Sequence, residues 1–203
     1  MKYLMCITLV LAACSGAAVE KDGVPGSAEP VLTVMATTGM VKDMVQQIGG
    51  DRIAVDSIMR EGVDPHLYQP MASDVRKVLA ADLVFASGLN LEGRMIEIFE
   101  RSRSMGVQVF LVTDRIEKAV LLDSADYPGQ HDPHVWHDVS QWSAGIPLVV
   151  AALSTADPSG AEIYERNAAG YATRLKNLHD YVTRVMASVP PDQRVLITAH
   201  DAF

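Results

Sequence analysis

The chain has 203 residues, of which 49% are hydrophobic and 21% are charged, and its formal net charge is −8. This composition provides enough apolar side chains for a packed core and excludes disorder as a global description. The acidic balance argues against a nucleic-acid partner, which would need clustered Lys and Arg. Both cysteines, Cys6 and Cys14, lie near the N-terminus, so a metal site in the folded body would have to use His, Asp and Glu.

Residues 1–13 (MKYLMCITLVLAA) combine one Lys, an apolar stretch and small residues, which is typical of a secretory signal peptide. The stretch is shorter than the roughly 20 apolar residues that span a bilayer. Residues 11–14 (LAAC) resemble the bacterial lipobox, so we expect Cys14 to be lipidated and to anchor the chain to the outer side of a bacterial membrane. An ordinary cleavable signal with a chance Cys is the alternative. Residues 14–30 are rich in Gly, Ala, Ser and Pro and are predicted to form a lipidated flexible tether.

Residues 31–156 alternate strand-like and helix-like segments, which predicts an α/β lobe with a parallel sheet and helices on its faces. Ligands of such sheets bind at the carboxyl ends of the strands. One further helix, over 140–156, contains Pro147, which costs about 3 kcal/mol inside a helix unless the helix kinks or begins later. The expected strands are 31–36, 52–59, 82–87 and 107–112, and the other expected helices are 37–48, 73–81 and 92–105.

Residues 157–189 are predicted to form one long linker helix of about 30 residues, roughly 45 Å in length. Asp157 is a plausible N-cap, and Pro190-Pro191 forbids continuation. Apolar residues recur at alternating spacings of 4 and 3, as on one helix face: Tyr164, Ala168, Tyr171, Leu175, Leu178, Val182, Val185 and Val189. A coiled coil is the competing interpretation. A strut between two lobes fits better, because residues 194–199 (RVLITA) are expected to form a strand directly afterwards.

The chain has six histidines. His66 follows the second expected strand, His200 follows the last, and His134 lies in HDPHVWHD at 131–138. Asp132-Pro133 disfavours a helix there, so we expect a turn in which only one of its three histidines points inward. His179, on the long helix, is predicted to be solvated. Imidazole suits Zn, Cu, Fe and Ni, and carboxylates extend the choice toward Mn.

Four motifs resemble the zinc- and manganese-type solute-binding lipoproteins of bacterial metal ABC transporters, in particular the treponemal Tro-type. The resemblance implies two α/β lobes joined by a long rigid helix, with the metal bound between them. His66 and His134 would be ligands from the first lobe and His200 the first ligand of the second lobe. A carboxylate later in the second lobe would be the fourth. The motifs are TTGM at 37–40, EGVDPHLY at 61–68, DPHVWHD at 132–138 and TAHDAF at 198–203.

The same resemblance implies an extracytoplasmic protein that captures Zn2+ or Mn2+ and delivers it to an ABC permease, with no chemical step. Imidazoles bind metal when neutral, so the affinity should fall below about pH 6.5. No long His-rich segment precedes Asp132, which favours a manganese-or-zinc Tro-type role. His137 is expected at the surface rather than as an accessory ligand.

Residues 190–203 are expected to contribute only the first strand of a second lobe, so this chain should bind metal weakly, through two or three imidazoles. Two other functions are the alternatives. One is a metal-dependent hydrolase that uses the cluster at 131–138, which would need a general base and an open metal position. The other is a surface adhesin lipoprotein.

Overall fold

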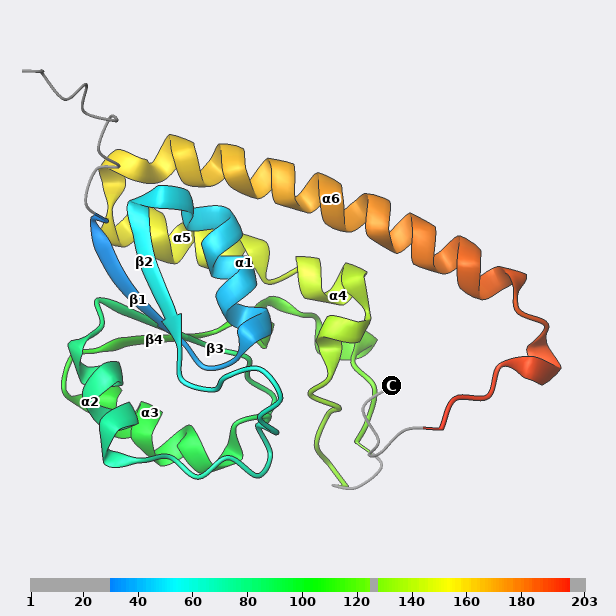
Figure 1. Ribbon diagram of the computed structural model, residues 1–203, viewed down its shortest axis with the longest axis horizontal. Helices are drawn as coiled ribbons and strands as arrows, with labels where there is room; N and C mark the ends of the chain where they lie inside the picture. Colours follow the sequence, from blue (N-terminus) through cyan, green and yellow to red (C-terminus); the bar gives the residue numbers. More distant parts are fainter. Residues whose placement is uncertain (1–29, 125–127, 198–203) are drawn as a thin grey trace, which may run out of the picture.

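The fold is α/β, with one parallel sheet of strand order β2-β1-β3-β4 and helices on both faces (Figure 1). The computed structural model describes residues 30–124 and 128–197. The strands are β1 (Leu32–Ala36), β2 (Ile53–Ser57), β3 (Leu83–Ala86) and β4 (Gln108–Leu111). The helices are α1 (Gly39–Gly49), α2 (Ala72–Ala80), α3 (Ile96–Ser104), α4 (Val139–Ser143), α5 (Ile146–Ala156) and α6 (Ala161–Ser188). The predicted parallel α/β lobe is therefore confirmed.

The two central strands are apolar because both of their faces are covered. All four residues of β3 are buried, and Val34 in β1 lies opposite Leu83 in β3 and Val55 in β2. Such near-continuous hydrophobic runs are characteristic of parallel strands with helices on both sides. The strands β2 and β4 form the two edges of the sheet.

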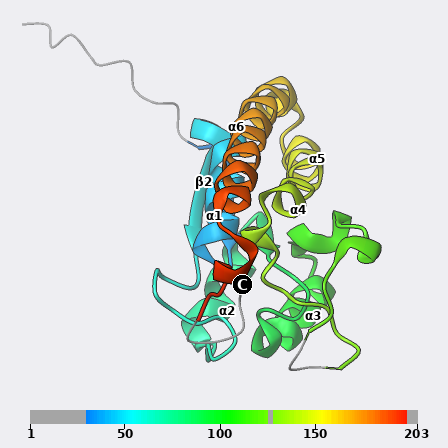
Figure 2. The ribbon, with the colours of Figure 1, turned by 90° about the vertical axis from the view of Figure 1, so that its right-hand side faces the viewer.

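The two faces of the sheet carry separate cores. Helices α1, α5 and α6 lie on one face, where Met44, Ile48 and Leu153 are fully buried. Helices α2 and α3 lie on the other, where Val78 and Phe99 pack against the sheet. Figure 2 shows the same layers from the side, with α6 running along the outside of α1 and α5.

Pro147 sets the start of α5 rather than interrupting a longer helix. The segment expected as one helix over 140–156 is divided into α4 and α5, and Pro147 lies in the first turn of α5. Proline is tolerated there because the missing N–H would have no partner within the helix. By length and composition Val139–Ala156 could also cross a membrane. Its buried residues instead belong to the core of this lobe.

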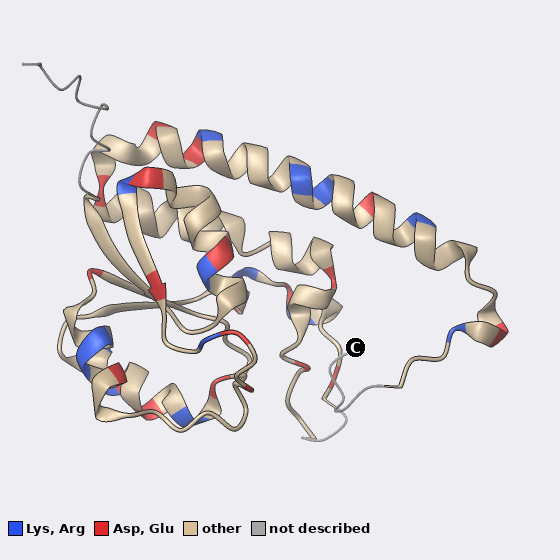
Figure 3. Cartoon of the chain, in the orientation of Figure 1, with Lys and Arg blue, Asp and Glu red and all other residues tan. Residues whose placement is uncertain are grey.

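The predicted long helix is confirmed as α6, whose 28 residues correspond to about 42 Å. Its first half packs on the lobe, with Tyr164, Ala168, Tyr171 and Leu175 buried. This packing within the chain contradicts a coiled coil over that half. The second half continues the apolar stripe in the open, with Leu178 46% and Val185 41% exposed. Figure 3 shows acidic and basic residues interspersed along the helix.

The strand expected at 194–199 is wrong over the residues that the structure describes. Residues 194–197 have no regular structure, and the preceding Pro191–Gln193 form a short 3-10 turn. Val195, Leu196 and Ile197 are 78%, 70% and 92% exposed. Residues 194–197 do not form a strand despite their β propensity, because a strand needs a neighbouring strand to satisfy its backbone hydrogen bonds.

Candidate metal centre

Two imidazoles that are far apart in the sequence meet beyond the carboxyl edge of the sheet. His66 lies on the loop after β2, and His134 lies on the long connection between β4 and α4. Their Nε2 atoms are 3.0 Å apart, and their ring centroids are 5.1 Å apart at an interplanar angle of 64°. The loops of the two edge strands thus reach across the sheet and bring together two of the predicted ligands.

Each of these histidines ends an Asp-Pro-His turn. Asp64 Oδ1 accepts a hydrogen bond from the backbone N–H of His66 at 2.8 Å, and Asp132 Oδ1 accepts one from that of His134 at 2.9 Å. Asp commonly forms this turn by accepting from the N–H two residues later, and the intervening proline keeps the Asp out of helical conformation. The repeated motif is therefore a local device that fixes the backbone at each imidazole.

The ring of His134 is held more firmly than this turn alone would hold it. Its Nδ1 lies 2.7 Å from Asp132 Oδ1, and its side chain is only 7% exposed. The ring of Trp136 packs edge-on against it, with the centroids 5.2 Å apart. His134 therefore has a polar and an apolar partner that restrict its rotation.

The loop that carries His66 is fastened to the start of α2. The Tyr68 hydroxyl donates to Asp74 Oδ2 at 2.7 Å, and the Met71 backbone N–H donates to the same oxygen at 2.7 Å. Burial and then this hydrogen bond raise the pKa of Tyr68 to about 12, so it remains a donor at neutral pH. The attachment lies two residues beyond His66, on an otherwise largely exposed loop.

The separation of the two Nε2 atoms suits a shared metal ion. Zn–N bonds of about 2.0–2.1 Å in a tetrahedral site place two ligand nitrogens about 3.3 Å apart. The distance in the structure is 3.0 Å, so a metal would need to part the rings by only a few tenths of an ångström.

The other described histidines make other contacts. His131 forms an isolated β-bridge with Asp123, and its Nδ1 lies 3.5 Å from Asp123 Oδ1. His137 is exposed, as expected, and packs against Trp136. His179 is only partly exposed and lines a hollow between α4 and α6, so the prediction of a fully solvated side chain was too simple. Of the three histidines in 131–138, His134 is the one that meets His66.

Two predicted residues cannot be placed. His200, the expected third ligand, and Cys14, the expected lipidation site, lie outside the described residues. Within residues 30–124 and 128–197, no group of three or more His, Cys, Asp and Glu side chains could hold a metal ion. The described part of the chain therefore supplies a pair of imidazoles, and the three-histidine set stays a prediction.

A buried carboxylate that sequence reasoning missed fills the crevice between β1 and β3. The chain leaves β1 toward β2 on one side and returns to β3 on the other, and ligands of open α/β sheets commonly bind at such a switch point. Here Glu92, only 3% exposed, accepts hydrogen bonds from Thr37 Oγ1 at 2.5 Å, Ser87 N at 2.8 Å and Gly88 N at 3.3 Å. The imidazole pair lies on the loops that follow the edge strands β2 and β4.

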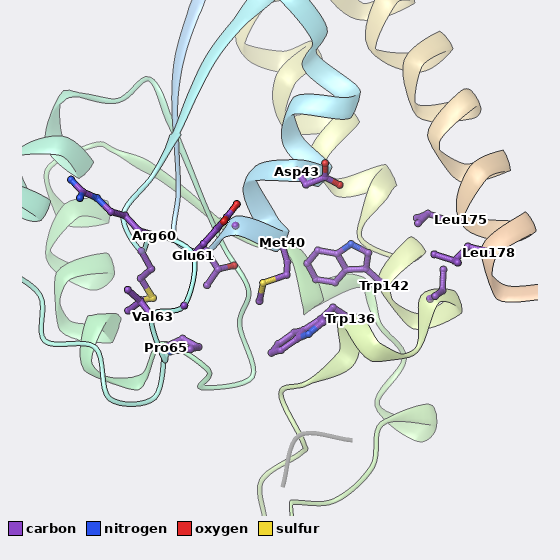
Figure 4. A pocket seen from close by; sticks show the side chains of 15 residues that line it. Met40, Asp43, Arg60, Glu61, Val63, Pro65, Trp136, Trp142, Leu175 and Leu178 are labelled. Carbon is purple, nitrogen blue, oxygen red and sulfur yellow. The ribbon is translucent and has the colours of Figure 1, made fainter. Parts of the chain in front are cut away.

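A hollow of about 570 Å³ lies beside the pair, between the loop after β2, the start of α1, and α6 (Figure 4). Pro65 and Trp136, neighbours in sequence of the two imidazoles, both line it. Met40, Trp142 and Leu178 give much of the remaining wall an apolar character.

Comparisons with known proteins show which family the chain resembles. The family described as "ZnuA: Zinc-uptake complex component A periplasmic" matches residues 34–203. The chain is 36% identical over 182 residues to the manganese-binding lipoprotein MntA of Bacillus subtilis, covering 90% of this chain and 59% of that protein. It is also 36% identical over 171 residues to the zinc-binding protein TroA of Treponema pallidum, covering 84% of this chain and 54% of that protein.

Solved structures show the same likeness. The periplasmic zinc-binding protein TroA of Treponema pallidum matches with a TM-score of 0.80 at 36% identity, over 85% of this chain and 61% of that one. A Mn-bound periplasmic metal-binding protein of Candidatus Liberibacter asiaticus matches with a TM-score of 0.70 at 28% identity, over 80% and 60% of the two chains.

The chain spans between half and two thirds of the length of these relatives. The match nevertheless includes the long helix, both Asp-Pro-His turns and all of the sheet except the first two residues of β1. The chain belongs to the ZnuA family of periplasmic zinc-uptake components.

Proposed function

We propose that the protein captures Zn2+ or Mn2+ outside the cytoplasmic membrane and delivers it to the permease of a metal ABC transporter. The observation that carries this proposal is the convergence of the His66 and His134 Nε2 atoms at 3.0 Å. Two imidazoles at this distance form a chelating pair, and both would bind the ion in their neutral form.

Both metals are kept in the proposal because the relatives divide between them. MntA is named as manganese-binding and TroA as zinc-binding. Imidazole ligands suit zinc, whereas oxygen ligands would favour manganese. The choice therefore depends on ligands other than the two imidazoles described above.

The ligands that we propose within residues 1–203 are His66, His134 and His200, with Cys14 as the lipid-bearing residue. In domain terms, 1–13 is the signal peptide, 14–30 the lipidated tether and 31–156 the metal-binding lobe. Residues 157–189 are the linker helix, and 190–203 begin a second lobe. The sequence motifs support these assignments, together with the lipoprotein names of relatives such as MntA.

The partners that follow are a permease, the divalent ion and a membrane reached through the lipid anchor, with no nucleic acid. The protein would be located on the outer side of the bacterial cytoplasmic membrane. The ion is cargo, so the protein would perform no chemical step and would not be an enzyme. The alternatives, a metal-dependent hydrolase and an adhesin, find no support in these relatives, which are named as metal-binding and transport proteins.

Calorimetric titration of the purified chain with Zn2+ and with Mn2+ tests the proposal. We expect His66→Ala and His134→Ala each to weaken the metal affinity by at least about 10- to 100-fold. Removal of a group that only orients a ligand typically has an effect of this size, and these variants remove a ligand itself. His179→Ala is the matched control, because His179 lies apart from the pair and should leave binding unchanged. Unaltered binding in both ligand variants would contradict the proposal.

A further inference from the structure

The two Asp-Pro-His turns differ in one contact. In both, the aspartate accepts from the backbone N–H of the histidine two residues later. Asp132 Oδ1 also contacts the histidine ring, with 2.7 Å to Nδ1 of His134. Asp64 therefore fixes only the backbone at His66, whereas Asp132 fixes the backbone at His134 and also orients the His134 ring.

The ring contact determines which nitrogen of His134 carries the proton. A carboxylate offers only acceptors, so the Nδ1 of His134 must be the donor. A neutral imidazole has one N–H, and its Nε2 is then left with an unshared electron pair. This is the nitrogen that faces Nε2 of His66 at 3.0 Å, so that hydrogen bond takes its proton from His66.

We propose that Asp132 is a positioning residue that holds His134 as the Nδ1–H tautomer and so presents its Nε2 electron pair to the metal. The inference rests on the proposed function and extends it to a residue outside the ligand set. Metal-binding histidines commonly donate their second N–H to a carboxylate, which fixes the ring and makes the ligand nitrogen more basic. His134 would be ready for metal, whereas the proton of His66 would have to move from Nε2 to Nδ1, by exchange with solvent, before its Nε2 could bind the ion.

The chain contains its own control for the turn. Asp132→Ala and Asp64→Ala both remove the backbone hydrogen bond of an Asp-Pro-His turn, but only Asp132→Ala removes the bond to a ring. Asp132→Asn keeps an oxygen that can accept both bonds and should retain part of the effect. Thermal unfolding of each variant shows that it is folded before it is compared.

The first measurement is nitrogen-15 NMR of the histidine rings in the metal-free chain, at a pH that keeps the imidazoles neutral. We expect His134 to show a protonated Nδ1 and an unprotonated Nε2 in the unaltered chain and in Asp64→Ala. In Asp132→Ala the two tautomers should mix. A protonated Nε2 on His134 in the unaltered chain, or an unchanged tautomer in Asp132→Ala, would overturn the inference.

The second measurement is Zn2+ affinity. Asp132→Ala should weaken Zn2+ binding about 10- to 100-fold, as is typical when a group that orients a metal ligand is removed. The loss in Asp64→Ala should be clearly smaller, and that in Asp132→Asn intermediate. Equal losses in the two alanine variants would show that Asp132 acts only through the turn. Failure of the unaltered chain to bind Zn2+ would instead remove the proposed function, while the NMR result would still decide the role of Asp132.

Discussion

Glu92 links the ends of two neighbouring strands of the sheet. Its carboxylate accepts from Thr37 at the end of β1 and from Ser87 and Gly88 at the end of β3. The backbone of Gly88, Leu89 and Asn90 turns back through three positive φ angles (100°, 51° and 64°) to place it there. Three donors from two strands thus share one internal acceptor.

Removal of this acceptor should destabilise the lobe. Glu92→Ala leaves three buried donors without a partner, and a single unsatisfied group costs about 1–3 kcal/mol. We expect a loss of about 3 kcal/mol or more in the free energy of unfolding, measured by urea denaturation. Glu92→Gln, which keeps one carbonyl oxygen, is the control and should lose less; equal losses would argue against this account.

The stability that is lost when Glu92 is replaced should also change with pH. Burial raises the pKa of Glu92 above its ordinary value of 4.5, although the bonds from Thr37, Ser87 and Gly88 act to lower it. A raised pKa means that this group favours the folded state below the unfolded value and loses that contribution as pH rises through the folded value. The free energies of unfolding of the unaltered chain and of Glu92→Gln, plotted against pH, should therefore diverge between the unfolded and the folded pKa of Glu92. Parallel curves would contradict a raised pKa.

At the scale of elements, α6 is attached to the sheet at its N-terminal end. Asp157 Oδ2 accepts from Arg52 Nε at 2.7 Å and from the Tyr164 hydroxyl at 2.6 Å, and its Oδ1 accepts from Ser159 Oγ at 2.6 Å. A Cβ at Gly160 would collide with this group, so glycine is required there. Asp157 was expected as an N-cap, but it instead joins the start of β2 to the start of the long helix.

The Asp157 attachment predicts a loss of stability in acid. Burial acts to raise its pKa, but hydrogen bonds from Ser159, Tyr164 and Arg52 outweigh burial and lower it to about 2. A lowered pKa stabilises the fold above the unfolded value of 3.8, and the contribution is lost as pH falls toward 2. Asp157→Asn should cost about 2 kcal/mol at neutral pH, and this difference should shrink between about pH 4 and 2.

Urea denaturation over a pH series would measure this difference. Asp180→Asn is the control, because Asp180 pairs with Lys176 on the exposed surface of the same helix. Lys176 also lowers the pKa of Asp180, but solvent screens an exposed pair, so the difference should be much smaller there. A cost of Asp157→Asn that is constant with pH would contradict the assignment.

The apolar stripe of α6 predicts that Leu→Ala substitutions at two positions on the same face will destabilise the fold by different amounts. Leu175 is 9% exposed in the core, whereas Leu178 is 46% exposed one turn later. Leu175→Ala should cost about 2–4 kcal/mol, and Leu178→Ala about 1 kcal/mol or less. Chemical denaturation would measure both losses of stability. A loss at Leu178 larger than the value expected for an exposed residue would mean that the second half of the stripe is covered in solution.

At the scale of the molecule, the imidazole pair sits where the two edge strands send their loops over the ends of the central ones. Strands β2 and β4 are separated by β1 and β3, so His66 and His134 meet only because both loops turn inward. The hollow beside them reaches the exposed half of α6. Pro65 and Trp136, the sequence neighbours of the imidazole pair, therefore line the same hollow as Leu178 in the exposed half of α6 (Figure 4).

Sequence patterns alone determined the alternating order of strands and helices and the single long helix. These depend on local periodicity, proline and glycine, which act over a few residues. The family resemblance carried by the two Asp-Pro-His motifs also singled out His66 and His134.

Tertiary structure decided what depends on distant partners. The strand expected at 194–199 is absent over 194–197, because its propensity has no neighbouring strand to pair with. The roles of Glu92 and Asp157 each require groups from distant parts of the chain that the fold alone brings within hydrogen-bond distance. A buried carboxylate is stable only when donors surround it, and no local pattern of residues reveals those donors.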